Sequence, residues 1–336
     1  MKAVIYRGKG NVTVSDWPMP EVRPGHVLVR VRACGVCGTD RHIYHGEFWS
    51  KPPVVLGHEF AGEVVALGEG VNDLSPGDRV AIDPNIACGT CRPCHQGKIH
   101  LCENLMAVGV NYDGGFAEYC LAPRKQLYPF AGDLPWDEAA MAEPVACCVH
   151  GIDLAGIQPG QTVLVIGGGA IGQIHAQLAR LSGASRVIVS DPVASRRQLA
   201  LDLGADAALD PQTMTVDEMR QALAGGADVV IEAVGSAATA EQSVQLAAAG
   251  GTVIWFGVAP GAARSTIAPY DIFRREITIR GSFVNPFTHS RALHLLTSGR
   301  LHVGPLITRR VSLDELPAAL AEPAGKDVKV TAIIHS

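Results

Sequence analysis

The chain has 336 residues, 47% of them hydrophobic and 18% charged, which is enough for two hydrophobic cores rather than one. A formal net charge of −5 argues against nucleic acid as a partner. The N-terminal stretch is too polar for a signal peptide, and no run reaches the roughly 18 to 20 apolar residues that span a bilayer. We therefore expect a cytoplasmic protein that has no membrane partner.

The first part of the chain, to about residue 145, has the pattern of a β-rich domain. Short runs of alternating apolar residues are interrupted by proline and glycine. Examples are HVLVRVRACG (26–35), FAGEVVALG (60–68) and DRVAI (78–82). We expect strands joined by loops in this part.

Metal-binding residue types gather in three segments of this domain, CGTDRHIYHG (37–46), LGHEFAGEVV (56–65) and AEPVACCVH (142–150). The candidate ligands of one metal ion are Cys37, His58, Glu59 and Glu143. A thiolate, an imidazole and a carboxylate leave one position of a tetrahedral Zn²⁺ open, as in a catalytic site. Because neighbours in an extended chain point to opposite sides, Glu59 would point differently from His58, and both carboxylates stay candidates.

Four further cysteines follow the pattern C-x2-C-x2-C-x7-C, namely Cys88, Cys91, Cys94 and Cys102. Nearby glycine and proline residues let the backbone curl so that four thiolates can surround one ion. Four thiolates fill the shell of Zn²⁺, so the predicted site is structural. The alternatives are two disulfides, which a reducing compartment and strain between close cysteines disfavour, and an iron–sulfur cluster, which the spacing alone admits.

Residues 161–191 predict a nucleotide-binding unit. The apolar run TVLVI (162–166) leads into GGGAIG, which matches G-x-G-x-x-G, and then into a helical pattern and a second strand, RVIVS (186–190). Glycine lets the backbone approach a pyrophosphate at the positive N-terminus of the helix. The candidate cofactor-binding residues of this turn are Gly167, Gly169, Ala170, Ile171 and Gly172.

Asp191 ends the second strand, 19 residues after Gly172, where its carboxylate can accept hydrogen bonds from both ribose hydroxyls. The same charge would repel the extra phosphate of NADP, so we expect NAD as the cofactor. Arg196 lies just beyond and is a further cofactor-binding candidate that weakens this preference. Predicted strands at 207–209, 227–235, 250–258 and 276–283 complete about six parallel strands of a doubly wound α/β sheet.

Taken in order, CGTDRH, GHE, the four-cysteine segment, EPVACCVH and GGGAIG resemble the zinc-dependent medium-chain alcohol dehydrogenases, particularly the polyol (sorbitol-like) dehydrogenase branch. The resemblance covers essentially the whole chain. It implies a two-domain α/β fold with a GroES-like catalytic domain at 1–146, a Rossmann domain at 147–284 and a return segment at 285–336 that completes the catalytic domain. It also implies a cofactor cleft between the domains and a homo-oligomer, either a tetramer or a dimer.

The resemblance further implies two zinc ions per chain, one structural and one catalytic. The catalytic ion would be held by Cys37 and His58 with Glu143, which stands where other alcohol dehydrogenases have cysteine, or with Glu59 as a direct ligand or a nearby catalytic group. Thr39 would pass the alcohol proton towards the nicotinamide ribose and His42, which exchanges it with solvent. Two aromatic residues, Tyr44 and Phe116, either line the substrate pocket or simply pack there.

The expected reaction is oxidation of a secondary alcohol, most simply a polyol, to the ketone. At Val284 and Asn285, where animal sorbitol dehydrogenases carry an arginine–tyrosine pair, valine cannot donate to sugar hydroxyls, so another sugar alcohol, a cyclitol or a smaller diol is favoured. L-Threonine 3-dehydrogenase shares the catalytic motifs and is the nearest rival. A zinc-free alkene or quinone reductase and a non-catalytic NAD-binding structural or sensor protein are more distant alternatives.

Overall fold

Two separate stretches of the chain, Met1–Ala146 and Asn285–Ser336, build one folded unit, and the stretch between them, Cys147–Val284, builds another. We call them unit 1 and unit 2. The computed structural model describes residues 1–322 and 325–335. Across these described residues, every helix is too short or too polar to cross a membrane.

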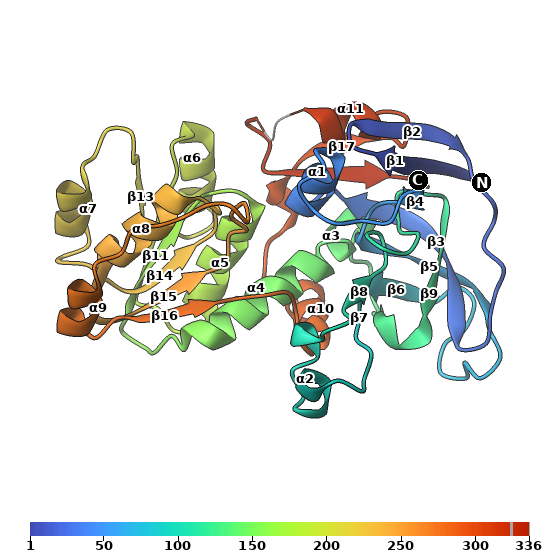
Figure 1. Cartoon of the computed structure of the whole chain (residues 1–336), viewed down its shortest axis with the longest axis horizontal. Helices are drawn as coiled ribbons and strands as arrows, with labels where there is room; N and C mark the ends of the chain where they lie inside the picture. Colours follow the sequence, from blue (N-terminus) through green and yellow to red (C-terminus); the bar gives the residue numbers. More distant parts are fainter. Residues whose placement is uncertain (323–324, 336) are drawn as a thin grey trace. The chain divides into compact units, whose positions relative to one another are not determined.

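Unit 1 is organised around a mixed, mostly antiparallel sheet in the order β10-β6-β5-β3-β18-β17, with β9 pairing the first half of β3 (Figure 1). The strands are β3 (His26–Gly35), β5 (Glu59–Leu67), β6 (Arg79–Ile82), β9 (Tyr119–Pro123), β10 (Leu127–Pro129), β17 (Ile307–Val311) and β18 (Lys329–Ile333). The last strand of the chain thus lies beside the third, so the two stretches of unit 1 share one sheet.

Smaller elements complete unit 1. A three-stranded sheet has the order β2-β1-β4, and a two-stranded sheet joins β7 to β8 next to the four-cysteine segment. The bounds are β1 (Lys2–Gly8), β2 (Asn11–Asp16), β4 (Val54–Val55), β7 (Asn85–Ile86) and β8 (Met106–Ala107). The helices are α1 (Gly38–Tyr44), α2 (Arg92–His95), α3 (Trp136–Ala139), α10 (His289–Thr297) and α11 (Leu316–Ala321), with 3-10 turns η1 (Ile99–Leu101), η2 (Arg124–Gln126) and η3 (Gly304–Leu306).

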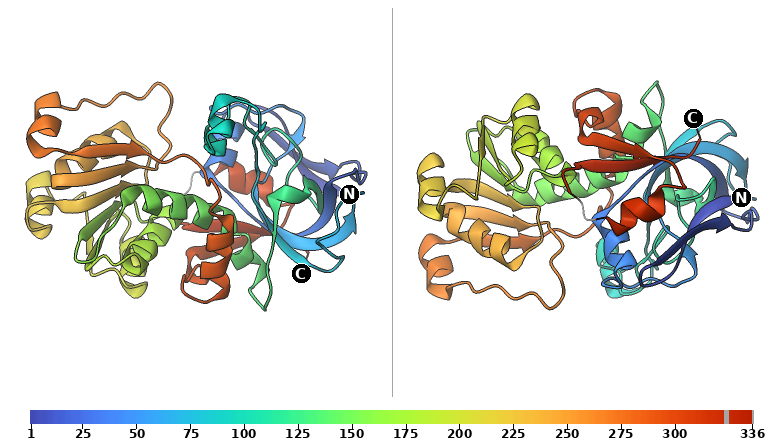
Figure 2. Two further views of the ribbon diagram at one scale, coloured as in Figure 1. Left: turned by 90° about the horizontal axis from the view of Figure 1, so that it is seen from below. Right: turned by 90° about the horizontal axis from the view of Figure 1, so that it is seen from above.

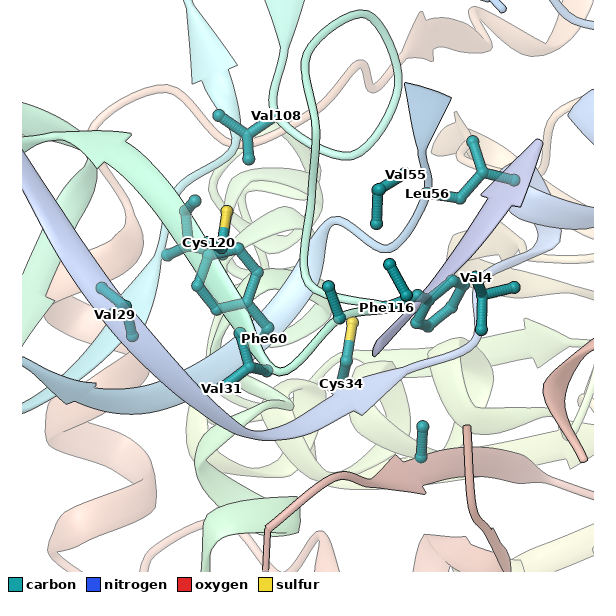
Figure 3. Close-up of a cluster of buried hydrophobic side chains, with 14 of the residues drawn as sticks. Val4, Val29, Val31, Cys34, Val55, Leu56, Phe60, Val108, Phe116 and Cys120 are labelled. Atoms are coloured by element: carbon teal, nitrogen blue, oxygen red, sulfur yellow. The ribbon is translucent and has the colours of Figure 1, made fainter. Parts of the chain in front are cut away.

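Apolar side chains of these strands form the core of unit 1, which Figure 3 shows in part. In β3, Val29 and Val31 are buried and alternate with the less buried Arg30 and Arg32, so this part of the strand turns its apolar face to the core. Phe60 and Phe116 are the largest side chains buried there, at 1% and 0% exposure. Cys34 and Cys120 also lie in this core, away from the four-cysteine segment in the sequence.

Unit 2 contains one parallel sheet in the order β13-β12-β11-β14-β15-β16. Its strands are β11 (Thr162–Ile166), β12 (Arg186–Ser190), β13 (Ala207–Leu209), β14 (Ala227–Glu232), β15 (Ala247–Trp255) and β16 (Thr278–Gly281). The order reverses between β11 and β14, which is the point where a doubly wound sheet binds its ligand.

Helices cover both faces of this sheet, as the two views of Figure 2 show. They are α5 (Ala170–Leu181), α6 (Ala194–Asp202), α7 (Val216–Ala222), α8 (Ala237–Leu246) and α9 (Pro269–Arg275). Helix α4 (Ala142–Ala155) runs from unit 1 into unit 2. The predicted α/β fold, with a β-rich part and a doubly wound parallel sheet, is confirmed.

Candidate active site

Strand pairing gathers three of the predicted metal ligands in unit 1. Gly35 at the end of β3 pairs with Glu59 at the start of β5, so the segment after β3 meets the segment before β5. Cys37 is the N-cap residue of α1, and His58 immediately precedes β5. The potential ligand atoms of Cys37, His58 and Glu59 all lie within 4.8 Å of one another.

The carboxylate of Asp40 lies beside the imidazole of His58. Asp40 is fully buried, and its Oδ1 lies 3.4 Å from His58 Nδ1. Its Oδ2 accepts a hydrogen bond of 2.8 Å from the backbone N–H of Cys37, which orients the start of α1. Burial lowers the pKa of His58, but Asp40 and Cys37 outweigh that effect and raise the pKa well above its ordinary value. With Asp40 facing Nδ1, the other ring nitrogen is the one available to a metal ion.

Lys329 of β18 is a buried cation at the same place, 6% exposed. Its ammonium forms an ion pair with Glu59 and donates a hydrogen bond of 3.1 Å to the carbonyl of Val36. Burial lowers the pKa of this ammonium, but the charges of Glu59, Cys37 and Glu143 together raise it by more, so the pKa is above its ordinary value. Lys329 therefore offsets part of the negative charge that the ligands bring into the interior.

The two candidate carboxylates are placed differently. Glu59 belongs to the convergent group, whereas Glu143, in the first turn of α4 and 8% exposed, stands outside it. Glu143 nevertheless acts electrostatically on Lys329. Glu59 is therefore the carboxylate that this geometry places with Cys37 and His58, and the direct ligand role of either carboxylate stays a prediction.

The donor set of this group fits Zn²⁺. A thiol, an imidazole and a carboxylate are the three ligand types that zinc takes in open sites. The imidazole is backed by a carboxylate, which is the usual support for a zinc-bound histidine. Zn²⁺ would be held by Cys37, His58 and Glu59.

The four cysteines of the second cluster also converge. The Sγ atoms of Cys88, Cys91, Cys94 and Cys102 lie within 4.8 Å of one another, and all nine cysteines of the chain are free of disulfides. The Sγ of Cys91 is 3.4 Å from that of Cys94 and 3.8 Å from that of Cys102. Tetrahedral Zn²⁺ with bonds of about 2.3 Å separates its sulfurs by about 3.8 Å, so the cluster fits one zinc ion.

Backbone amides point at the sulfurs of this cluster. The N–H groups of Cys88 and Asn104 donate to Cys102 Sγ at 3.2 and 3.4 Å, and the N–H of Thr90 donates to Cys88 Sγ at 3.5 Å. The Thr90 amide is the main cause that lowers the pKa of Cys88 to about 5. Such amides stabilise thiolates, the form in which cysteine binds metal.

The glycine turn of unit 2 has the geometry that the motif predicts. Gly167 has φ +102°, and a Cβ on Gly172 would lie 1.7 Å from the carbonyl oxygen of Gly167, so no larger residue fits there. Gly169 is the N-cap of α5, and Ala170 and Ile171 begin that helix, whose first amides have no carbonyl partner within the helix. This turn fits the pyrophosphate of a dinucleotide.

Asp191 lies directly beside this turn and is 3% exposed. Its Oδ2 accepts a hydrogen bond of 2.7 Å from the N–H of Gly168, and its Oδ1 accepts one of 2.8 Å from the N–H of Val193. Arg196 Nη1 stands 3.8 Å from Oδ2. The structure thus brings Asp191 and Arg196 together at the glycine turn, with one negative and one positive group beside it.

The predicted proton-transfer residues lie three apart on α1, which puts Thr39 and His42 on one side of the helix. His42 Nδ1 lies 2.7 Å from Glu47 Oε2. Tyr44 ends α1 and is half-buried against the core, whereas Phe116 is entirely inside it. The location of Phe116 favours the packing role over contact with a substrate.

Asn285, one of the two positions that match the arginine–tyrosine pair of animal sorbitol dehydrogenases, is buried and hydrogen-bonded within unit 1. It is 2% exposed, its Oδ1 accepts a hydrogen bond of 2.5 Å from Asn85 Nδ2, and its own Nδ2 donates to His289 Nδ1 at 3.0 Å. Both ends of the amide are therefore used inside unit 1. Val284, the last residue of unit 2, has φ +45°, a strained value for a β-branched residue.

Asp40 and Lys329 are the two residues at the metal group that the sequence analysis missed. Asp40 could have been found from its place three residues after the N-cap Cys37, where a carboxylate commonly accepts the cap amide. Lys329 carries no local signal, because it meets Glu59 only through the pairing of β18 with β3.

Comparison with known proteins agrees with this architecture. Residues 23–132 match the family model of the alcohol dehydrogenase GroES-like domain, and residues 170–298 match that of zinc-binding dehydrogenases. D-altritol 5-dehydrogenase of Agrobacterium fabrum is 37% identical over 94% of both chains. L-Threonine 3-dehydrogenase of Pyrococcus horikoshii is also 37% identical, over 87% of this chain and 86% of its own.

A solved structure shows the same fold over nearly the full length. It is that of a Sinorhizobium meliloti 1021 protein named as a zinc-binding dehydrogenase and bound to NADP, with 48% identity, a TM-score of 0.96 and coverage of 99% of this chain and 98% of the other. The fold and its two cysteine-containing clusters thus define a zinc-dependent dehydrogenase that uses a nicotinamide cofactor. The chain belongs to the medium-chain alcohol dehydrogenase family, in the branch of the polyol dehydrogenases.

Proposed function

We propose that this enzyme oxidises a polyol or sugar alcohol at a secondary hydroxyl to the ketone, with one catalytic zinc ion and NAD. The observation that carries the proposal is the convergence of Cys37, His58 and Glu59 within 4.8 Å, one thiol, one imidazole and one carboxylate. That set leaves a position for an alcohol oxygen, in contrast to the closed set of four cysteines. The relatedness to D-altritol 5-dehydrogenase supports a sugar alcohol as the substrate class.

Each residue of the site then has a task. When bound, Zn²⁺ would act as a Lewis acid that makes an alcohol easier to deprotonate, and NAD would accept the hydride. Asp40 orients His58, and Lys329 holds the carboxylate of Glu59 and balances its charge. Thr39 takes the alcohol proton, and His42, which is 36% exposed, exchanges it with water. Glu143 stands as a second carboxylate near Lys329.

NAD rather than NADP is the proposed cofactor, because a 2′-phosphate would have to sit against the buried carboxylate of Asp191. Arg196, 3.8 Å from that carboxylate, and the NADP in the related Sinorhizobium structure favour NADP as the second candidate. Replacing Asp191 with serine should lower the ratio of kcat/KM for NAD to that for NADP by about tenfold or more, which is about 1.4 kcal/mol. Asp202→Asn, on exposed α6, is the control that should leave the ratio unchanged.

We also propose that the enzyme works in the cytoplasm as a homo-oligomer, either a dimer or a tetramer. A reducing compartment is favoured because none of the nine cysteines, all of them among the described residues, forms a disulfide. Light scattering of the zinc-loaded protein would report its mass in solution. The mass of a monomer at the assay concentration would disprove the proposed homo-oligomer.

The reaction is tested by following the absorbance of reduced nicotinamide with zinc-loaded protein and a panel of alditols, cyclitols, simple secondary alcohols and L-threonine. We expect turnover of an alditol or cyclitol, and its loss in Cys37→Ala and His58→Ala while NAD still binds. Substantial activity in these two variants would disprove the zinc assignment.

L-Threonine oxidation is the second candidate, because the Pyrococcus relative of that name is as similar to this chain as the altritol enzyme is. Turnover of L-threonine alone in the same panel would assign the chain to that activity. Turnover of a polyol alone would exclude it.

A further inference from the structure

We propose that Glu47 is a positioning residue that holds the imidazole of His42 by Nδ1 and so presents Nε2 for proton transfer. The proposal rests on the proposed function, in which His42 exchanges the substrate proton with solvent. Its basis is the distance of 2.7 Å between Glu47 Oε2 and His42 Nδ1. Neither the family resemblance nor the sequence motifs had singled out Glu47.

The way α1 ends places Glu47 beside His42. Gly46 adopts the left-handed conformation, with φ +73°, which favours glycine. The N–H of Gly46 donates to the carbonyl of Ile43 at 2.9 Å, and the N–H of Glu47 donates to the carbonyl of His42 at 2.8 Å. These two hydrogen bonds form a Schellman motif, in which the residue after the glycine folds back onto the last turn of the helix. Here the two side chains that meet are a carboxylate and an imidazole.

The protonation state of Glu47 decides which nitrogen of His42 carries hydrogen. The hydrogen bond from His42 is the largest influence on the Glu47 carboxyl and lowers its pKa below the ordinary value, while His45 and Lys9 act in the same direction. Glu47 is therefore a carboxylate at neutral pH and can only accept. Nδ1 must then be the donor, and in the neutral ring Nε2 keeps its lone pair.

The resulting proton step is balanced at the ring. A proton that arrives from the Thr39 side of α1 forms a bond to Nε2, and the imidazolium keeps its Nδ1–H bonded to the carboxylate of Glu47. The Nε2–H bond then breaks, and the proton passes to water. No other bond changes, and Glu47 stays ionised throughout.

Exposure of the pair agrees with this task. The side chains of His42 and Glu47 are 36% and 58% exposed, so the ring has access to water. An exposed ion pair of this kind contributes little to the free energy of unfolding. Replacing Glu47 should therefore alter the orientation and tautomer of His42 without unfolding the protein.

The test uses zinc-loaded, full-length protein and compares Glu47→Ala with Glu69→Gln, a control at another exposed glutamate of unit 1. Nitrogen NMR of labelled histidine reports the tautomer of His42 without any turnover, with His42→Gln to assign its signals. We expect the Nδ1–H tautomer in the parent and in Glu69→Gln, and a shift towards Nε2–H in Glu47→Ala.

Kinetics with the polyol found in the panel give the second readout. We expect Glu47→Ala to lower kcat about tenfold with little change in KM, and added imidazole buffer to restore part of it, because a general base can replace a misoriented one. An unchanged tautomer in Glu47→Ala overturns the proposal. The proposal is also overturned if Glu47→Ala has the same kcat as Glu69→Gln while His42→Gln turns over slowly. If His42→Gln itself turns over like the parent, the proton-transfer role of His42 in the proposed function fails instead, and the tautomer alone decides the role of Glu47.

Discussion

Lys329 shows at the scale of single residues how much of a metal site lies outside its ligands. Its ammonium is buried beside Glu59, and three acidic groups, Glu59, Glu143 and Cys37, act on it. A carboxylate left in that interior without its cation would be costly. The residue therefore contributes to the stability of the zinc-free protein as well as to the charge balance of the loaded one.

We expect Lys329→Met to lower the free energy of unfolding of the zinc-free protein by about 3 to 5 kcal/mol, the cost of breaking a buried ion pair. Zinc should restore part of this loss, because the ion gives Glu59 a new positive partner. Urea unfolding with and without zinc measures both effects. Lys329→Arg keeps the charge and is the control. An equal loss in both metal states would show that the lysine acts only by packing.

At the residue scale, short motifs predicted groups of residues that the structure brings together, while their roles as ligands stay predictions. Each of these motifs consists of residues that are close in sequence. They are CGTDRH and GHE, the four cysteines and the glycine turn. Prediction from the sequence failed for Lys329, which reaches Glu59 only across 270 positions of sequence through strand pairing. It also left Glu59 and Glu143 unranked, because the choice depends on how the start of β5 is turned.

At the scale of elements, the four-cysteine segment with α2 and η1 is held by its sulfurs rather than by a core of its own. In α2 and η1 no residue is buried. A metal that binds only the folded lobe adds its binding free energy to folding. The segment should therefore depend on zinc for its structure.

We expect Cys94→Ser to reduce the zinc content from two ions per chain to one and to destabilise the lobe by several kcal/mol. Metal analysis after dialysis, together with proteolysis near residue 97, measures these effects. Cys120→Ala removes a thiol from the hydrophobic core and should keep both ions. Loss of both ions in Cys94→Ser would mean that the two clusters are not independent.

A buried polar network joins the β6–β7 segment to the start of α10. Asp83 accepts hydrogen bonds from the N–H and side-chain amide of Asn85, which in turn donates to Asn285, and Asn285 donates to His289. Burial is the main cause that raises the pKa of Asp83 to about 6, and it lowers that of His289 to about 3. The two groups therefore give the folding free energy opposite dependences on pH.

The raised pKa of Asp83 determines the direction in which the free energy of unfolding changes with pH. An acid that binds its proton more tightly in the folded state favours folding below its ordinary pKa near 3.8, and that contribution is lost as the pH rises through about 6. Asp83→Asn cannot ionise. The stability of the parent relative to this variant should thus fall by about 2 kcal/mol between about pH 4.5 and pH 7.5. Urea unfolding at both pH values checks this, with the exposed Asp16→Asn as the control substitution. A parent that gains stability over Asp83→Asn as the pH rises would contradict it.

Element-scale prediction was accurate for the six strands of unit 2 and for the three runs named in unit 1, because their apolar patterns are strong and glycine or proline marks their ends. β3 and β11 to β13 have the predicted bounds, and β14 to β16 differ from them by a few residues. The network at Asn285 was not foreseen, since a polar residue after a strand gives no sign that its amide will be buried. The family resemblance had singled out this position only as one that matches the arginine–tyrosine pair of animal sorbitol dehydrogenases.

At the scale of the molecule, unit 1 is discontinuous, and β18 occupies an inner position of its sheet between β3 and β17. That single feature sets the order in which a growing chain can complete its parts. Unit 2 is contiguous and has all its strands once residue 281 has been synthesised, whereas β3 can pair with β18 only after residues 329–333 have been made.

The cysteine lobe can bind zinc early, because its ligands lie within 15 residues, 88 to 102. Cys37, His58 and Glu59 can meet early too, but their cation arrives with the last strand. A chain released before that strand is made would contain Cys37, His58 and Glu59 but not the ammonium of Lys329, which balances their negative charge.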